Sequence, residues 1–270
     1  MGALTCSNPV LSEERLWPAL QQTIRASTNA TVGGVVFKTA ISMGLAAMSG
    51  AVGYSLAKNN PGLVMVAGVV SFVASLAVFF ALRGRPAWAA FLCPAYAIVQ
   101  GFMLGAFAMV LDGILAAQGI SLPGGVAAPA FLMTVGVATA CLVLYRSGVV
   151  RLSERGTFVL GCVVMGIAIA YGISFVLGMF GVAVPFLSLP TETGTSTGAW
   201  IGLGINGVIL VVAALTLVAD IGQVDRAVAN GTPKSSEWYL AFGLVASLVW
   251  IYIESMKIVF RLAMMFGKRD

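Results

Sequence analysis

Long apolar runs separated by short polar breaks fill this chain from residue 34 to near its end. A helix rises 1.5 Å per residue, so a run of about 20 apolar residues is long enough to cross the hydrocarbon core of a bilayer. The sequence therefore predicts an all-α polytopic membrane protein with seven transmembrane helices. The predicted spans are Gly34–Ala57, Leu63–Leu82, Ala87–Leu111, Ala127–Tyr145, Thr157–Gly181, Trp200–Ala219 and Trp238–Phe266.

Composition supports this class of protein. Hydrophobic residues make up 59% of the 270 residues and charged residues only 9%, whereas soluble domains are typically about 45–50% apolar and about 25% charged. A transmembrane β-barrel would show short segments of alternating polarity, and the sequence has none. We expect a cytoplasmic N-terminal segment at residues 1–33, a seven-helix transmembrane domain at 34–266 and a short tail at 267–270.

The placement of basic residues predicts the orientation in the membrane. Lys and Arg residues gather in the N-terminal segment and in every second break, whereas the intervening breaks hold only Lys58. Because cytoplasmic loops are enriched in Lys and Arg, the N-terminus is expected in the cytoplasm. Lys257 and Arg261 in the last span, with Lys268 and Arg269 after it, conflict with a full crossing. The last segment is therefore either a full crossing with an exported C-terminus or a re-entrant segment.

Two carboxylates lie deep in apolar sequence near the C-terminus. Asp220 closes the sixth apolar run, and Glu254 interrupts the seventh. A charged side chain at the bilayer centre costs roughly 2.5–3.5 kcal/mol on insertion scales, so such residues usually have a partner or a task. Arg83 ends the second span on the same predicted side as Asp220, which places both at the cytoplasmic face.

Two interpretations of these acids are open. Lys257 follows Glu254 by one helical turn and could neutralise it as a structural ion pair, and Asp220 could lie in water at the end of its span. Alternatively, two carboxylates brought close together would form a proton-sensitive site that also attracts a hard cation such as Ca²⁺.

Several other classes of function are disfavoured. The chain has no histidine, which excludes His-based catalysis, and it contains no HExxH or GxSxG motif, so we expect it not to be an enzyme. Gly202-Leu-Gly-Ile-Asn-Gly207 has dinucleotide-binding spacing but lies inside an apolar span, where glycines more often allow helices to approach closely. Lys257 also suggests a retinal Schiff base, but the third span offers no acid within it as counter-ion.

The C-terminal third resembles the Bax inhibitor-1 superfamily (transmembrane Bax-inhibitor motif proteins), in particular its bacterial YccA-like branch. The similarity rests on five segments and extends over nearly the whole chain. These segments are Ser7-Asn-Pro-Val-Leu11, Leu144-Tyr-Arg-Ser-Gly148, Val218-Ala-Asp220-Ile-Gly-Gln-Val-Asp225, Glu237-Trp-Tyr and Trp250-Ile-Tyr-Ile-Glu254-Ser-Met.

The resemblance implies a central seventh helix and a role for both acids. It implies that Asp220 and Glu254 form a proton-sensitive latch and cation site, with Arg83 or Arg85 as the latch partner. This chain departs from the family pattern, because Glu254 replaces an aspartate and Ala219 replaces a tyrosine.

The expected function is therefore a pH-sensitive calcium leak in a bacterial inner membrane. The expected partners are the bilayer, calcium and protons, with no nucleic acid and no cofactor beyond Ca²⁺ as a transported or bound ion. The alternative is a non-conducting regulator that binds a membrane protease or another stress-response membrane protein.

Overall fold

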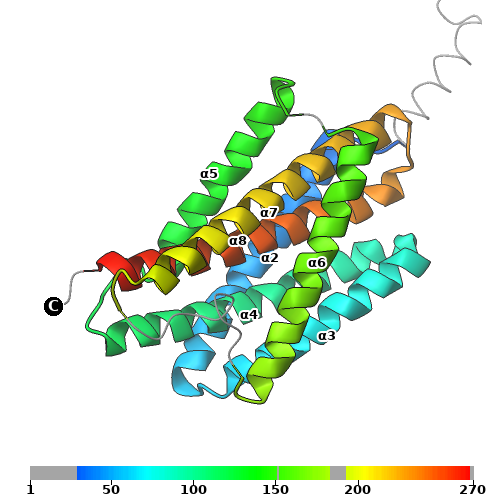
Figure 1. Ribbon diagram of the computed structural model, residues 1–270. Helices are drawn as coiled ribbons and strands as arrows, with labels where there is room; N and C mark the ends of the chain where they lie inside the picture. Colours follow the sequence, from blue (N-terminus) through cyan, green and yellow to red (C-terminus); the bar gives the residue numbers. More distant parts are fainter. Residues whose placement is uncertain (1–28, 151, 183–192, 268–270) are drawn as a thin grey trace, which may run out of the picture.

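The computed structural model describes residues 29–150, 152–182 and 193–267, so most of the predicted N-terminal segment and the last residues of the predicted tail lie outside the described residues. Seven helices in this part of the chain are long and apolar enough to cross a membrane. They are α2 (Val32–Asn59), α3 (Leu63–Gly84), α4 (Ala89–Ala117), α5 (Ala127–Arg146), α6 (Glu154–Met179), α7 (Thr197–Ala229) and α8 (Glu237–Phe266) (Figure 1).

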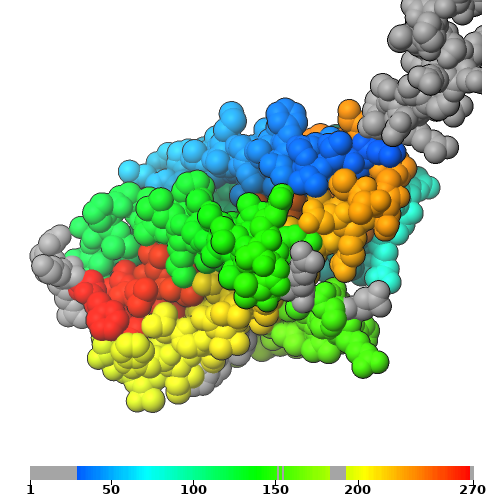
Figure 2. Space-filling view, turned by 90° about the horizontal axis from the view of Figure 1, so that it is seen from above, coloured from blue at the N-terminus to red at the C-terminus, as the bar shows by residue number. Residues whose placement is uncertain are grey.

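The helix α8 lies at the centre of the bundle, as expected for the seventh span. It packs against α2, α4, α5 and α7, and many of its residues are buried along its whole length. In the space-filling view, the C-terminal end of α8 reaches the surface between neighbouring helices (Figure 2). The helices α2 to α7 all have exposed large apolar side chains, whereas α8 forms much of the core.

The helix α8 runs from one end of the bundle to the other. Its start lies at the end that holds the start of α2, because the carboxylate of Glu237 accepts a hydrogen bond from the backbone N–H of Thr31 (2.9 Å). Its last turn lies at the opposite end, where the N–H of Gly194 donates to the carbonyl of Met264 (3.1 Å). We call these ends the N face and the C face. The seventh segment is thus one continuous helix that reaches from one end of the bundle to the other and does not turn back within it.

The sixth span is longer than its apolar run predicts. The helix α7 does not end near Asp220 but continues to Ala229. Val224 is buried beyond that point, and Ala227 and Val228 pack against a cluster of buried apolar residues that come mainly from α7 and α8. A charged residue ends an apolar run but does not end a helix when the following turns still bury apolar side chains. Asp220 is therefore a residue of the helix interior.

The helices α2 and α4 approach each other closely at glycines. A Cβ atom on Gly101 would overlap the carbonyl oxygen of Ala46, and one on Gly105 would overlap that of Gly50. Small residues allow this approach, and in lipid such contact is a main source of helix association. The four-residue spacing of Gly101 and Gly105 marks the contact surface of α4 with α2.

A buried ion pair joins the start of α2 to the start of α8. Glu237 is fully buried and pairs with Lys38. It also accepts hydrogen bonds from the backbone N–H of Thr31 (2.9 Å) and from the Thr31 hydroxyl (3.2 Å). In addition, the ammonium of Lys38 lies 5.6 Å from the ring centre of Trp238. Sequence reasoning named Glu237 only within the segment Glu237-Trp-Tyr and gave it no role, because an acid at a helix start normally faces water.

Replacing Glu237 with alanine is expected to lower the free energy of unfolding by about 1–3 kcal/mol, because Lys38 and the Thr31 N–H lose their acceptor. Unfolding in mixed detergent micelles measures this change. Lys234→Ala is the control, since Lys234 lies one turn away and is exposed. Equal stability of the two variants would contradict a structural role for the pair.

Candidate functional site

The carboxylate of Asp220 lies between α7 and α8 near the N face. The hydroxyl of Ser247 on α8 donates a hydrogen bond to its Oδ2 atom (2.5 Å). A buried carboxylate in an apolar span needs a hydrogen-bond donor, and the Ser247 hydroxyl supplies one. This hydrogen bond joins Asp220 to the last helix.

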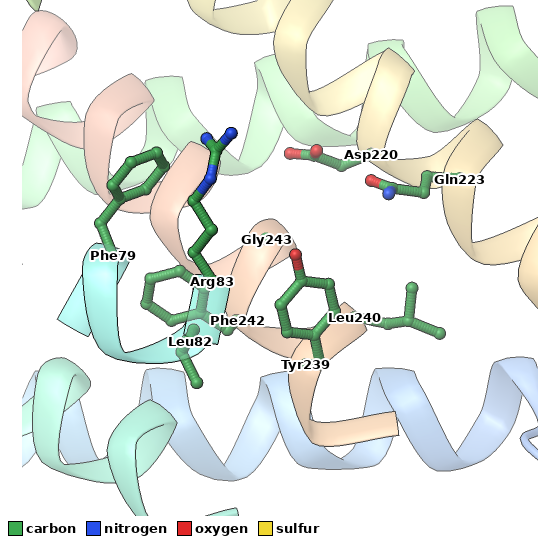
Figure 3. A pocket seen from close by; sticks show the side chains of 9 residues that line it. All are labelled: Phe79, Leu82, Arg83, Asp220, Gln223, Tyr239, Leu240, Phe242 and Gly243. Carbon is green, nitrogen blue, oxygen red and sulfur yellow. The ribbon is translucent and has the colours of Figure 1, made fainter. Parts of the chain in front are cut away.

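Asp220 and Arg83 line one cavity of about 220 Å³. The guanidinium of Arg83 comes from the last turn of α3 and lies at the same end of the cavity as the Asp220 carboxylate (Figure 3). The two side chains share the cavity without forming an ion pair. The other lining residues come from α3, α7 and α8 and are Phe79, Leu82, Gln223, Tyr239, Leu240, Phe242 and Gly243.

The other predicted latch partner, Arg85, has a different neighbour. Its guanidinium lies 5.1 Å from the ring centre of Trp88, a distance that allows a cation–π contact. Arg85 is also not among the residues that line the Asp220 cavity. Of the two candidates, Arg83 is therefore the one that the structure brings to Asp220.

Glu254 is the centre of a second polar group, deeper in the bundle. It is fully buried. Its Oε1 atom accepts from the ammonium of Lys257 (2.7 Å) and from the hydroxyl of Tyr171 on α6 (2.9 Å). Its Oε2 atom accepts from the amide of Asn206 on α7 (2.9 Å). Three helices therefore supply the donors that a buried carboxylate requires.

The same group holds two basic side chains. Lys257 donates to the Tyr171 hydroxyl as well (2.6 Å), and the Nε of Arg261 donates to the side-chain carbonyl of Asn206 (2.6 Å). A Cβ atom on Gly202 would overlap the guanidinium of Arg261. The first glycine of the Gly202–Gly207 motif thus makes room for a charged side chain within α7, and the motif lies inside a helix rather than at a phosphate-binding turn.

The two carboxylates occupy successive levels along α8. Ser247, the partner of Asp220, precedes Glu254 by seven residues, which is two helical turns or about 10 Å along the axis. Both residues therefore face the same side of α8. In this state Asp220 and Glu254 have separate hydrogen-bond partners and are not in contact with each other.

Sequence reasoning found the charged members of these groups but missed the neutral ones. Lys257 and Arg261 follow Glu254 at helical spacing, and the ion pair between Lys257 and Glu254 is confirmed. Asn206 and Tyr171 were not singled out. The available signal was a single polar side chain within an apolar run, which in membranes usually makes an interhelical hydrogen bond.

The carboxylates do not form a cluster suited to a resident metal ion. In the part of the chain that the structure describes, no group of three or more His, Cys, Asp or Glu side chains is placed to hold a metal. Calcium sites in proteins normally use six to eight oxygen ligands with several carboxylates.

The comparison with known proteins agrees with this fold. Residues 8–264 match the family described as Bax inhibitor 1 like. No curated protein and no solved structure gives a match. The family match covers nearly the whole chain and confirms the resemblance read from its residues. This seven-helix membrane protein belongs to the Bax inhibitor 1-like family.

Proposed function

We propose that the protein is a pH-sensitive cation leak, with calcium as the expected ion. The observation that carries this proposal is the placement of two carboxylates along one side of the central helix, at successive levels of the bundle. Acids at such positions are costly and typically mark ion or proton pathways. Asp220 would receive the ion from the cavity near the N face, and Glu254 would be the next carboxylate along the path of the ion.

The N face is proposed to be the cytoplasmic face of a bacterial inner membrane. Four basic residues at helix ends lie on that face, at Arg83, Arg146, Arg155 and Arg226. The positive-inside rule then places the Asp220 cavity on the cytoplasmic side. Since α8 reaches from the N face to the C face, its C-terminal end would lie on the opposite side of the membrane.

The proposed gate depends on the charge of the Asp220 cavity. The ionisable groups that line it are Asp220, Arg83 and Tyr239. With Asp220 ionised and Tyr239 neutral, the lining carries no net charge. When Asp220 takes up a proton, only the positive charge of Arg83 remains, and it repels cations. Flux should therefore fall as the pH decreases.

Liposomes that hold the protein and a calcium dye provide the test. Asp220→Asn is expected to reduce calcium flux by roughly two orders of magnitude at neutral pH, because one unit charge acting on a divalent ion over about 10 Å at an effective dielectric of about 20 contributes about 3.3 kcal/mol. Glu254→Gln should also reduce flux, because it leaves Lys257 without its counter-charge.

The matched control is Asp225→Asn. Asp225 lies on the same helix as Asp220 but lines a different cavity, together with Tyr145 and Arg226. Its replacement is expected to leave flux unchanged. Equal flux in the wild type, Asp220→Asn and Glu254→Gln would show that neither acid takes part in conduction.

A further inference from the structure

The ammonium of Lys257 occupies a position beside Glu254 that suits a metal cation. It is 2.7 Å from Oε1 of Glu254 and 2.6 Å from the hydroxyl oxygen of Tyr171. It also lies 4.2 Å from the centre of the Tyr171 ring. A carboxylate oxygen, a phenolic oxygen and an aromatic face are all groups that attract positive charge.

The carboxylate is held ready for a cation by groups other than Lys257. Asn206 donates to Oε2, and Arg261 in turn donates to the Asn206 carbonyl. The Tyr171 hydroxyl donates to Oε1, so its lone pairs remain free to face a positive charge. These contacts fix both oxygens of Glu254 and would persist if the lysine were absent.

The ammonium of Lys257 explains why an ion from solution is excluded in this state. It lies directly against Oε1 of Glu254, at the place that a metal cation would take. A metal cation beside it would put two positive charges in contact in an apolar environment, where uncompensated charge is expensive. Removing Lys257 would leave Oε1 without its ion-pair partner.

We propose that Glu254 and Tyr171 form a cation-binding site that the chain itself fills with the ammonium of Lys257. A hard metal cation from solution binds there only when that ammonium is withdrawn. This inference rests on the proposed function, because it concerns the Glu254 carboxylate of the proposed ion pathway. The present structure, with the ammonium of Lys257 in place, is then the closed state of the leak. Lys257 acts as a tethered ion on a flexible four-carbon stem.

The helix α6 provides a wall that can yield when the site opens. All of its described side chains are at least partly exposed, in contrast to the many buried residues of α8. Its contacts with other helices include the stacking of Phe175 on Phe72 (5.4 Å between ring centres) and the hydrogen bonds of Tyr171. An exposed helix with few buried side chains is the type of element that moves at low cost.

The test measures binding and not flux. Lys257→Met and Lys257→Gln are purified in detergent, and their unfolding temperatures are followed in N-methylglucamine chloride, sodium chloride and calcium chloride. Both variants are expected to show a saturable rise in unfolding temperature with sodium or calcium, because a ligand that binds the folded state stabilises it. The wild type should show no such saturable rise.

The double variant Glu254→Gln/Lys257→Met is the matched control, since it removes the carboxylate and should show no rise. If the single variants fold only in metal-containing buffer and not in metal-free buffer, this result would also support the site. Failure of both variants to fold with and without metal would overturn it, because a bound cation should replace the missing charge. A rise of equal size in the double variant would also overturn it.

The outcome separates this inference from the proposed leak. Metal binding by the single variants without any calcium flux in liposomes would support the site and contradict the leak. Conversely, a leak that depends on Asp220 and Glu254, together with Lys257 variants that do not bind metal, would support the leak and contradict the tethered ion.

Discussion

Replacing Glu254 with alanine is expected to lower the free energy of unfolding by about 3–5 kcal/mol, the largest effect of any single change that we predict. The substitution removes the acceptor of Lys257, Tyr171 and Asn206 at once. Loss of one partner from a buried ion pair leaves an uncompensated charge, which is what makes the change so costly. Unfolding by a denaturing detergent in mixed micelles measures the loss.

A double-mutant cycle tests whether the pair is the cause. Glu254→Met together with Lys257→Met removes both charges, and apolar replacement of a whole buried pair is often nearly neutral. The double variant should therefore be more stable than the Glu254→Ala variant and should lose less than the two single methionine variants combined. Strict additivity of the single effects would contradict the ion pair as the source of the loss.

Replacing Gly105 with alanine is expected to destabilise the protein by about 3 kcal/mol, near the upper end of what overpacking costs. The new Cβ atom would overlap the backbone carbonyl of Gly50 on α2. Backbone cannot rotate away as a side chain can, so α2 and α4 must separate along their contact surface. The same unfolding measurement reports the change.

Gly113→Ala is the control for this substitution. Gly113 lies on the same helix, and a Cβ atom there would have no neighbour within 4 Å. Because alanine favours a helix over glycine by up to about 1 kcal/mol in water, this variant should be as stable as the wild type or slightly more so. Equal destabilisation of the two variants would show that the close approach of α2 and α4 is not important for stability.

Features that arise within a single helix could be predicted from the sequence. The seven spans follow from run length, and the pairing of Glu254 with Lys257 follows from their spacing of three residues. Both depend only on the geometry of one helix. The four-residue spacing of Gly101 and Gly105 likewise indicates a surface for close contact between helices.

Contacts between helices could not be predicted in the same way. Tyr171 and Asn206 reach Glu254 only because α6 and α7 are rotated so that these side chains face α8, and apolar runs do not record that rotation. The pair of Lys38 and Glu237 joins residues 199 positions apart in the chain. The end of α7 was misplaced because a charged residue, Asp220, was taken as the limit of the membrane span.

Calcium entry into liposomes as a function of pH tests the proposed function most directly. Entry into liposomes with the wild-type protein should exceed entry into protein-free liposomes at neutral pH. It should fall on acidification, as a protonated Asp220 leaves the charge of Arg83 unbalanced, and Asp220→Asn should remove that pH dependence. No entry above the protein-free level at any pH, or a pH response that persists in Asp220→Asn, would contradict the account.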